Sequence, residues 1–395
     1  MIAIIIFRLF ELVLLFWGVV ASVAFYISRN RFNKLGIRSL SAPSTVEIKL
    51  QQSPTRFTGF DLFVLSLSVL CKYIPFTKGY HNELIPHKDK QQAFDLPLIQ
   101  VSGPLRFDQS DIQRFQRALQ PNVKGRKPEI DDDGPANSLF LVALTAPLVI
   151  YVLALHASPI KPLGAVNTRN AFHYHDPAMC NDITKLLQAS NEGRLQVSAR
   201  FGGPQNPGIR KKRGMDFSMI IEVRKHEEVL FTQELHFLQF LKSGQKPKFD
   251  PEQRQSEQNN DEDMEDQDSL ETCALPRFDV TTPRLWASSC GDYNPIHILP
   301  LAAVLFGFPS VIAHGNHVVA LAVEEARLKD QQRFNEAHQI LYGRKPFTLD
   351  VQFIKPMVLP ATFHVAWQVR RNAEGVRLIV MKGDRDCVIG SCYVD

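Results

Sequence analysis

The chain has 395 residues, of which 45% are hydrophobic and 22% are charged, an ordinary globular composition with enough length for two or three domains. Its net charge is +4, but nine acids and one Arg in residues 252–271 leave a net charge of +12 on the rest, which favours an anionic partner. Six scattered cysteines without a CxxC pair exclude a disulfide framework and a cysteine zinc site. The sequence also lacks Gly-rich phosphate loops and a G-x-S-x-G motif, which argues against nucleotide-binding folds and serine hydrolases.

The chain begins with an apolar segment. Residues 2–27 would extend about 39 Å as a helix at ~1.5 Å per residue, enough to cross a bilayer. A cleaved signal peptide is the alternative, with Ser22 and Ala24 near the cleavage site, but the basic residues at 29–34 follow the apolar run instead of preceding it. We therefore expect residues 1–31 to form a single-pass membrane anchor, with the catalytic part facing the cytoplasm.

Two further apolar segments follow. Residues 32–94 are predicted to be a membrane-proximal region, in which 62–71 is too short to span a bilayer and fits an interfacial or buried helix. Residues 139–155 are almost entirely apolar, and hydropathy alone allows either a second membrane span or a buried central helix.

The rest of the chain predicts two copies of one arrangement, a helix followed by an antiparallel sheet. Within 95–245, the apolar helix is followed by alternating, β-branched segments typical of an antiparallel sheet. Residues 246–274 are acidic and nearly devoid of large apolar side chains, which predicts a disordered linker. Within 275–395, a helix again precedes strands. The expected fold class is therefore α+β, with two similar domains behind a transmembrane helix.

A weak internal repeat supports this duplication. The stretch "GPLRFDQSDIQRFQRAL" at 103–119 resembles "LPRFDVTTPRLWASSC" at 275–290. In this alignment, Pro121 occupies the position of Asp292, so the first copy lacks an acid that the second copy has. The repeat predicts one catalytic domain, the C-terminal one, and one non-catalytic domain.

The stretch "GDYNPIH" at 291–297 is the first candidate site. Asn294 followed by Pro295 is a typical helix start, and Asp292 and His297 could simply be turn and surface residues there. Alternatively, because the helix begins only at Pro295, Asp292 on the loop and His297 on the first turn can face one cleft. They could then share a water molecule for acid–base chemistry.

A second stretch, "SVIAHGNH" at 310–317, places Gly315 at a predicted helix start, where its N–H can stabilise an oxyanion. Together, a water, a general base and an oxyanion donor are what addition of water to an α,β-unsaturated thioester requires. His314 and His317 are three residues apart, but the sequence supplies no third ligand nearby, so no metal site is predicted.

"GDYNPIH" followed by "FGFPSVIAHG" resembles the MaoC-like hydratase/dehydratase family, which includes R-specific enoyl-CoA hydratases. The resemblance implies two tandem hot-dog domains, each a long helix wrapped by an antiparallel sheet, and makes 139–155 the buried helix of the first. It implies that Asp292 and His297 are the catalytic pair and Gly315 the oxyanion donor, with Asn294, His314 and Asn316 at the substrate. Two departures, Asn316-His317 in place of an apolar pair and Val304 in place of a basic residue, bear on acyl preference.

The function expected from these features is reversible hydration of trans-2-enoyl thioesters, or dehydration of (R)-3-hydroxyacyl thioesters, carried by CoA or acyl carrier protein. No cofactor and no nucleic acid partner are expected. The chain is expected to form a homodimer. Two alternatives stay open: a hot-dog thioesterase, and a non-catalytic acyl-carrier-binding subunit of a membrane lipid-synthesis complex.

Overall fold

The computed structural model describes residues 45–73, 84–87, 92–120, 136–241, 272–328, 335–369 and 375–395. The anchor predicted at 1–31 lies outside these ranges, as does most of the acidic segment predicted to be a linker. Among the described residues, no helix has both the length and the hydropathy that a membrane span requires. The predicted domain boundaries stay a prediction.

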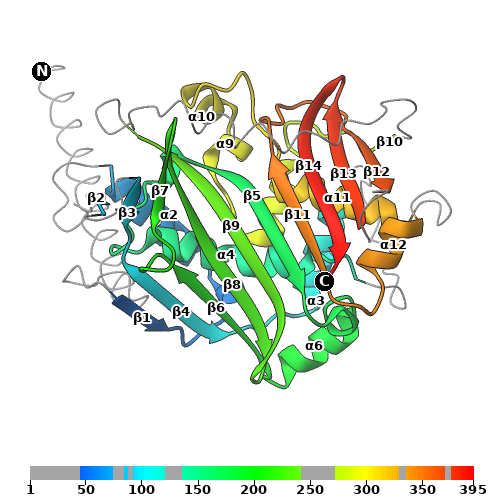
Figure 1. Cartoon of the computed structure of the whole chain (residues 1–395), viewed down its shortest axis with the longest axis horizontal. Coiled ribbons are helices and arrows are strands. Elements are labelled where there is room, and N and C mark those ends of the chain that lie inside the picture. Colours follow the sequence, from blue (N-terminus) through cyan, green and yellow to red (C-terminus); the bar gives the residue numbers. More distant parts are fainter. Residues whose placement is uncertain are drawn as a thin grey trace, which may run out of the picture.

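One continuous sheet runs across the molecule in two halves (Figure 1). In the first half, the strands lie in the order β4 (Leu98–Pro104), β6 (Leu195–Phe201), β8 (Gly214–Lys225), β9 (Glu228–Phe240) and β5 (Ala165–Tyr174). In the second half, the order is β11 (Phe347–Phe353), β14 (Arg385–Val394), β13 (Gly375–Lys382), β12 (His364–Val369) and β10 (Cys273–Ala274). All these neighbours are antiparallel, whereas β1 (Thr45–Lys49) runs parallel to β4 at the edge. Three short strands, β2 (Ile85–Pro86), β3 (Ala93–Asp95) and β7 (Gly208–Lys211), extend from β8.

The two halves join where β5 pairs with β11. Residues 169–174 of β5 lie opposite residues 347–352 of β11. Tyr174 and Phe347 are opposite each other in this register, and their rings stack with centroids 4.4 Å apart. Both side chains are fully buried, so the junction has the character of a core and the halves form one body.

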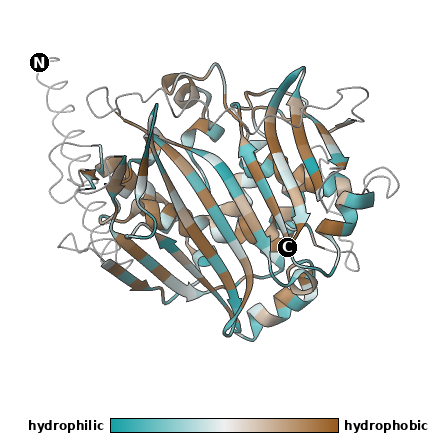
Figure 2. Cartoon of the chain, in the orientation of Figure 1, coloured by the Kyte–Doolittle hydropathy of each residue, from teal (hydrophilic) through white to brown (hydrophobic). Residues whose placement is uncertain are grey.

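Each half packs its sheet against one long helix, α4 (Phe140–Ala154) in the first half and α11 (Gly315–Leu328) in the second. Helix α4 is buried on nearly every side, which explains why its sequence is apolar all round. The segment 139–155 is therefore a buried helix and not a second membrane span. Figure 2 shows the complementary pattern in the strands, where hydrophobic and hydrophilic residues alternate because one sheet face meets these helices.

The internal repeat has a structural counterpart. Helix α3 (Gln109–Leu119) follows β4, and helix α8 (Pro283–Cys290) follows β10, and the two helices pack against each other. Phe107 and Phe278, which the repeat aligns, are both buried in the core just before these helices. Pro121, aligned with Asp292, lies outside the described residues.

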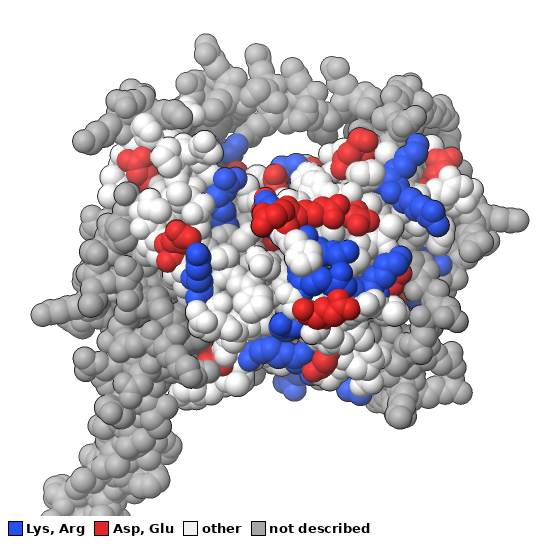
Figure 3. Space-filling model, turned by 90° about the horizontal axis from the view of Figure 1, so that it is seen from below, with Lys and Arg blue, Asp and Glu red and all other residues white. Residues whose placement is uncertain are grey.

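Shorter helices complete the two halves: α5 (Pro177–Cys180), α6 (Ile183–Asn191), α9 (Pro295–Ile298), α10 (Pro300–Leu305), α12 (Asn335–Leu341), and the 3-10 turns 54–56 and 162–164. Basic and acidic side chains are interspersed on the face shown in Figure 3. The positive charge that remains outside the acidic segment is therefore not gathered into one continuous area on this face.

Helix α2 (Gly59–Cys71) corresponds to the predicted interfacial or buried helix, and it packs on α4. The hydroxyl of Ser68 donates to the carbonyl of Ala154 over 2.7 Å. Lys72 follows the helix, and its Nζ donates to three backbone carbonyls: Leu153 at 2.6 Å, Ser158 at 2.8 Å and Ile160 at 3.2 Å. Burial lowers the pKa of Lys72 to about 7.

Replacing this lysine is expected to destabilise the first half. Lys72→Met removes the donor for three carbonyls at a site that water does not reach, so we expect the free energy of unfolding to fall by about 2–5 kcal/mol. Urea denaturation measures this. The matched control is Lys185→Met, because Lys185 is exposed and only pairs with Asp182, a contact whose loss costs ~1 kcal/mol or less. Equal stability of the two variants would contradict the role given to Lys72.

Candidate active site

The first part of the site lies between the end of helix α8 and the start of helix α9. Helix α8 ends at Cys290, and Gly291 adopts the left-handed conformation with φ +70° that turns the chain. Asp292 Oδ1 then accepts from the backbone N–H of Asn294 over 3.1 Å. Asn294 caps α9 by accepting from the N–H of Ile296 over 3.3 Å. The capping role predicted for Asn294 is therefore real, and it places Asp292 on the loop and His297 on the helix.

The second part is the start of α11. Ile312 bridges to Val358 beside the sheet, and His314 and Gly315 follow directly. Gly315 meets the ring of Phe353 so closely that a Cβ there would lie 2.3 Å from Phe353 Cε1. Only glycine therefore lets the first turn of α11 approach β11 at this distance.

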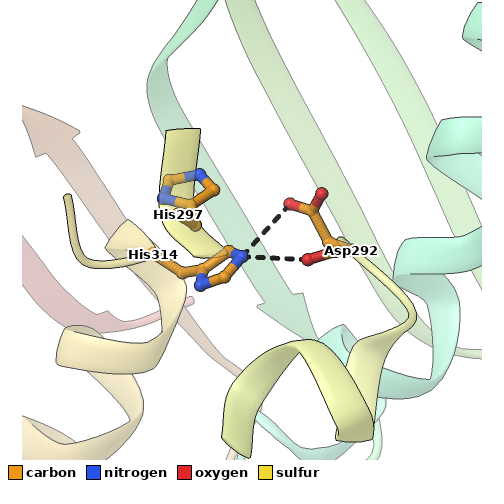
Figure 4. A group of neighbouring side chains, drawn as sticks. All are labelled: Asp292, His297 and His314. Atoms are coloured by element: carbon orange, nitrogen blue, oxygen red, sulfur yellow. Dashed lines mark hydrogen bonds and ion pairs between the residues drawn. The ribbon is translucent and has the colours of Figure 1, made fainter. Parts of the chain in front are cut away.

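Three side chains converge between these parts: Asp292, His297 and His314 (Figure 4). His314 Nε2 lies 3.1 Å from the backbone oxygen of Asp292 and 3.6 Å from its carboxylate Oδ2. The rings of His297 and His314 stack with centroids 3.8 Å apart. The geometry thus brings Asp292 and His297 into one group, while their catalytic roles stay a prediction.

The carbonyl contacts determine the tautomers of both rings. His297 Nδ1 lies 2.8 Å from the carbonyl oxygen of Ile312, and a carbonyl can only accept, so Nδ1 carries the proton. The other nitrogen, Nε2, is then the one that can take a proton from a substrate or water. By the same reasoning His314 Nε2 donates to the Asp292 carbonyl, which leaves the buried His314 Nδ1 without a hydrogen-bond partner among the described residues.

Burial keeps these imidazoles neutral. It lowers the pKa of His297, although the negative charge of Asp292 acts in the opposite direction. It holds the pKa of His314 well below its usual value, and the neighbouring His297 and His317 lower it further. A neutral His297 is the form in which an imidazole works as a general base.

A metal ion is the other possible occupant, because one ligand atom from each of the three residues lies within 4.8 Å of the others. However, His314 Nε2 already donates to the Asp292 carbonyl, and binding a cation there would remove that hydrogen bond. The carboxylate and His297 Nε2 can each still accept a hydrogen bond, and two acceptors are suited to holding a water molecule. The donor set therefore fits acid–base chemistry better than a metal.

The remaining sequence-predicted residues contact other parts of the protein, and their roles at the substrate stay a prediction. His314 is 4% exposed, and it contacts the Asp292 carbonyl and the ring of His297. Asn316 Oδ1 accepts from Asn170 Nδ2 over 2.8 Å, and Asn170 belongs to β5 of the first half. His317 is fully buried, bonds the Ala118 carbonyl through Nε2 at 2.7 Å and stacks on Trp286. Asn316 and His317, where the chain departs from the family, thus join α11 to the N-terminal half.

The buried histidines predict sensitivity to acid. Burial lowers the pKa of His317 to about 4 from its usual 6.5, so below pH 6.5 the unfolded chain binds a proton that the folded chain does not. The free energy of unfolding should therefore fall as the pH drops from 6.5 towards 4, by about 3 kcal/mol for His317 alone. His297 and His314 add to the fall.

Urea denaturation between about pH 6.5 and 5, a range in which few carboxylates titrate, measures this slope. In His317→Gln the slope should be smaller. A wild-type stability that stays constant over this interval would contradict the prediction.

Comparison with known proteins relates the C-terminal part of the chain to one family model. Residues 256–386 match the family model of the MaoC like domain. The curated 3-hydroxyacyl-thioester dehydratase X of Mycobacterium tuberculosis is 28% identical over 224 residues, which cover 56% of this chain. The match spans 65% of that protein, slightly less than two thirds of its length.

Solved structures share the fold. The crystal structure of HtdX of Mycobacterium tuberculosis matches with a TM-score of 0.50 and 22% identity, covering 75% of this chain and all of that one. A MaoC-like dehydratase from Phytophthora capsici matches with a TM-score of 0.52 and 13% identity, covering 76% of this chain and 95% of that one. Residues 256–386 are therefore similar to the MaoC like domain, and the fold of the chain is the hot-dog fold of these dehydratase structures, as the resemblance predicted.

Proposed function

We propose that the chain catalyses the reversible hydration of trans-2-enoyl thioesters and the dehydration of (R)-3-hydroxyacyl thioesters, carried by CoA or acyl carrier protein. The observation that carries the proposal is the convergence of the Asp292 carboxylate and the bare Nε2 of His297 beside the first turn of α11. The similarity to a 3-hydroxyacyl-thioester dehydratase supports the same reaction. The R configuration rests on the resemblance of "GDYNPIH" to R-specific enoyl-CoA hydratases.

Hydration would use these groups as follows. A water held between Asp292 and His297 gives up a proton to His297 Nε2 as its oxygen bonds to C3 of the enoyl group. The negative charge moves to the thioester oxygen, where the N–H of Gly315 and the positive end of α11 stabilise it. The enolate then takes this proton back from His297 at C2, which leaves His297 neutral again and gives the 3-hydroxyacyl thioester. Dehydration follows the same steps in reverse.

Three assays on the full chain distinguish the proposal from its alternatives. Loss of enoyl absorbance with crotonyl-CoA measures hydration, and chiral analysis of the product should give the R isomer. Release of free CoA thiol without hydration would instead identify a thioesterase. Binding of an acyl carrier protein without either reaction would identify a non-catalytic subunit.

We also propose that residues 1–31 anchor the protein in a membrane with the catalytic part in the cytoplasm. The length of the apolar segment and the basic residues after it support this. Deleting residues 2–31 should move most of the protein to the soluble fraction with crotonyl-CoA hydration retained, because the described core of both sheet halves consists of residues from Val46 onwards. A deletion variant that sediments with membranes as completely as the full chain would contradict the anchor. The homodimer stays a prediction, which sedimentation velocity would test.

A further inference from the structure

Helix α10 has an outer face that is apolar. Leu301, Val304 and Leu305 follow the i, i+3, i+4 spacing and share one side of the helix, where they are 74%, 55% and 78% exposed. Ala303 on the opposite side is fully buried. The helix therefore presents to the outside the side chains that a helix of a water-soluble protein normally turns inwards.

This surface continues on both sides of the helix. Leu299 before it and Phe306 after it are also exposed, and we call these five residues the α10 patch: Leu299, Leu301, Val304, Leu305 and Phe306. None of the residues from 298 to 313 is charged. The exposed Arg284 borders the patch and donates from Nη2 to the carbonyl of Ile298 over 3.3 Å.

The α10 patch is attached to the catalytic loop. Helix α9, which carries His297, ends at Ile298, and α10 begins two residues later. The N–H of Ile312 donates to the carbonyl of Ile296 over 3.2 Å and closes the segment back on α9. In Figure 1, α10 lies at the upper rim of the molecule, with α9 between it and the sheet. Whatever contacts the patch therefore lies close to the helix that carries His297.

We propose that the α10 patch inserts into the surface of a lipid bilayer, so that the site receives acyl thioesters whose acyl chains lie in the membrane. An uncharged apolar surface bordered by a basic side chain matches hydrocarbon beneath anionic head groups. The apolar segment of residues 2–27 supplies a second membrane-binding signal in the same chain. A second copy of the chain fits less well, because a stable interface takes roughly 20–30 residues from each partner and the α10 patch has five.

The contact itself is tested with a fluorescent probe on the full chain in vesicles of phosphatidylcholine and phosphatidylserine. Cys71→Ser and Cys273→Ser remove the two partly exposed thiols, and Leu305→Cys carries an environment-sensitive label. We expect blue-shifted emission that lipids with brominated acyl chains quench. The matched control is the label at Tyr393→Cys on β14, also exposed, which should stay unquenched. Adding Leu301→Glu should abolish the quenching at 305.

No quenching at 305, or equal quenching at both positions, would overturn the proposal. Emission at 305 that responds to protein concentration in the absence of lipid, without quenching in vesicles, would overturn it in favour of a contact between copies.

Delivery of substrate, which rests on the proposed function, has its own assay. Leu301→Glu/Leu305→Glu should hydrate soluble crotonyl-CoA at the wild-type rate but lose activity towards a long-chain trans-2-enoyl-CoA presented in vesicles. Equal rates of the variant and the wild type on the long-chain substrate would overturn the delivery role. If the wild-type protein hydrates neither substrate while quenching at 305 persists, the proposed function fails and the membrane contact stands.

Discussion

Asp292→Asn and His297→Gln are each expected to lower kcat for crotonyl-CoA hydration by about 10²–10⁴-fold, the usual contribution of one positioned acid–base group. The double variant should be little worse than either single one, because groups that act on one water are strongly non-additive. Both amides keep the size of the side chain they replace, and Asn at 292 can still accept from the N–H of Asn294. Melting temperatures should therefore stay close to the wild-type value.

A matched control uses a histidine outside the site. His175→Gln changes a residue whose Nε2 contacts Thr232 Oγ1 at 3.0 Å on the sheet, and it should leave kcat unchanged. If Asp292 and His297 only shape the turn and the helix, the pattern is the reverse, with lower melting temperatures and normal turnover. Full activity of Asp292→Asn would end the catalytic assignment.

The pH dependence adds an independent test. Hydration should fall at low pH, when His297 becomes protonated and can no longer take a proton. The charge of Asp292 raises the pKa of His297 against the effect of burial. Removing that charge in Asp292→Asn should therefore move the acid limb of the residual activity to lower pH. An acid limb that stays in place would show that another group controls it.

Gly315→Ala is the second variant with a large expected effect. The new Cβ would lie 2.3–2.8 Å from three atoms of the Phe353 ring, so α11 or the ring must move. Because the proposed oxyanion donor is the N–H of this residue, we expect kcat to fall by about 10²–10³-fold. Overpacking should also lower the free energy of unfolding by ~1–3 kcal/mol.

Two companion variants isolate the cause. Gly307→Ala introduces a methyl group at φ +87° with no atom within 4 Å, so it strains the backbone without touching Phe353 and should leave kcat close to wild type. Gly315→Ala/Phe353→Leu removes the ring that the methyl group meets and should recover part of both stability and turnover. Full activity of Gly315→Ala would remove Gly315 from the oxyanion site.

Features that depend on neighbours along the chain were determined by the sequence itself. The apolar run at 139–155 predicted a helix, which is α4, but hydropathy alone left a membrane span open, and the family resemblance favoured the buried helix. Asn294 and Pro295 start α9, because an N-cap acceptor and a fixed φ act within a few residues. The motifs at 291–297 and 314–315 therefore indicated the family and the expected chemistry before any contact was known.

Contacts between distant residues were decided by the tertiary structure alone. His314 meets Asp292 across 22 residues, and His317 meets Ala118 across 199, because the packing of α3, α8 and α11 brings these elements together. The pairing of β5 with β11 joins the halves and places Asn170 against Asn316. The sequence also could not show which side of α10 is exposed, because the exposure of an apolar residue depends on the elements that pack around it.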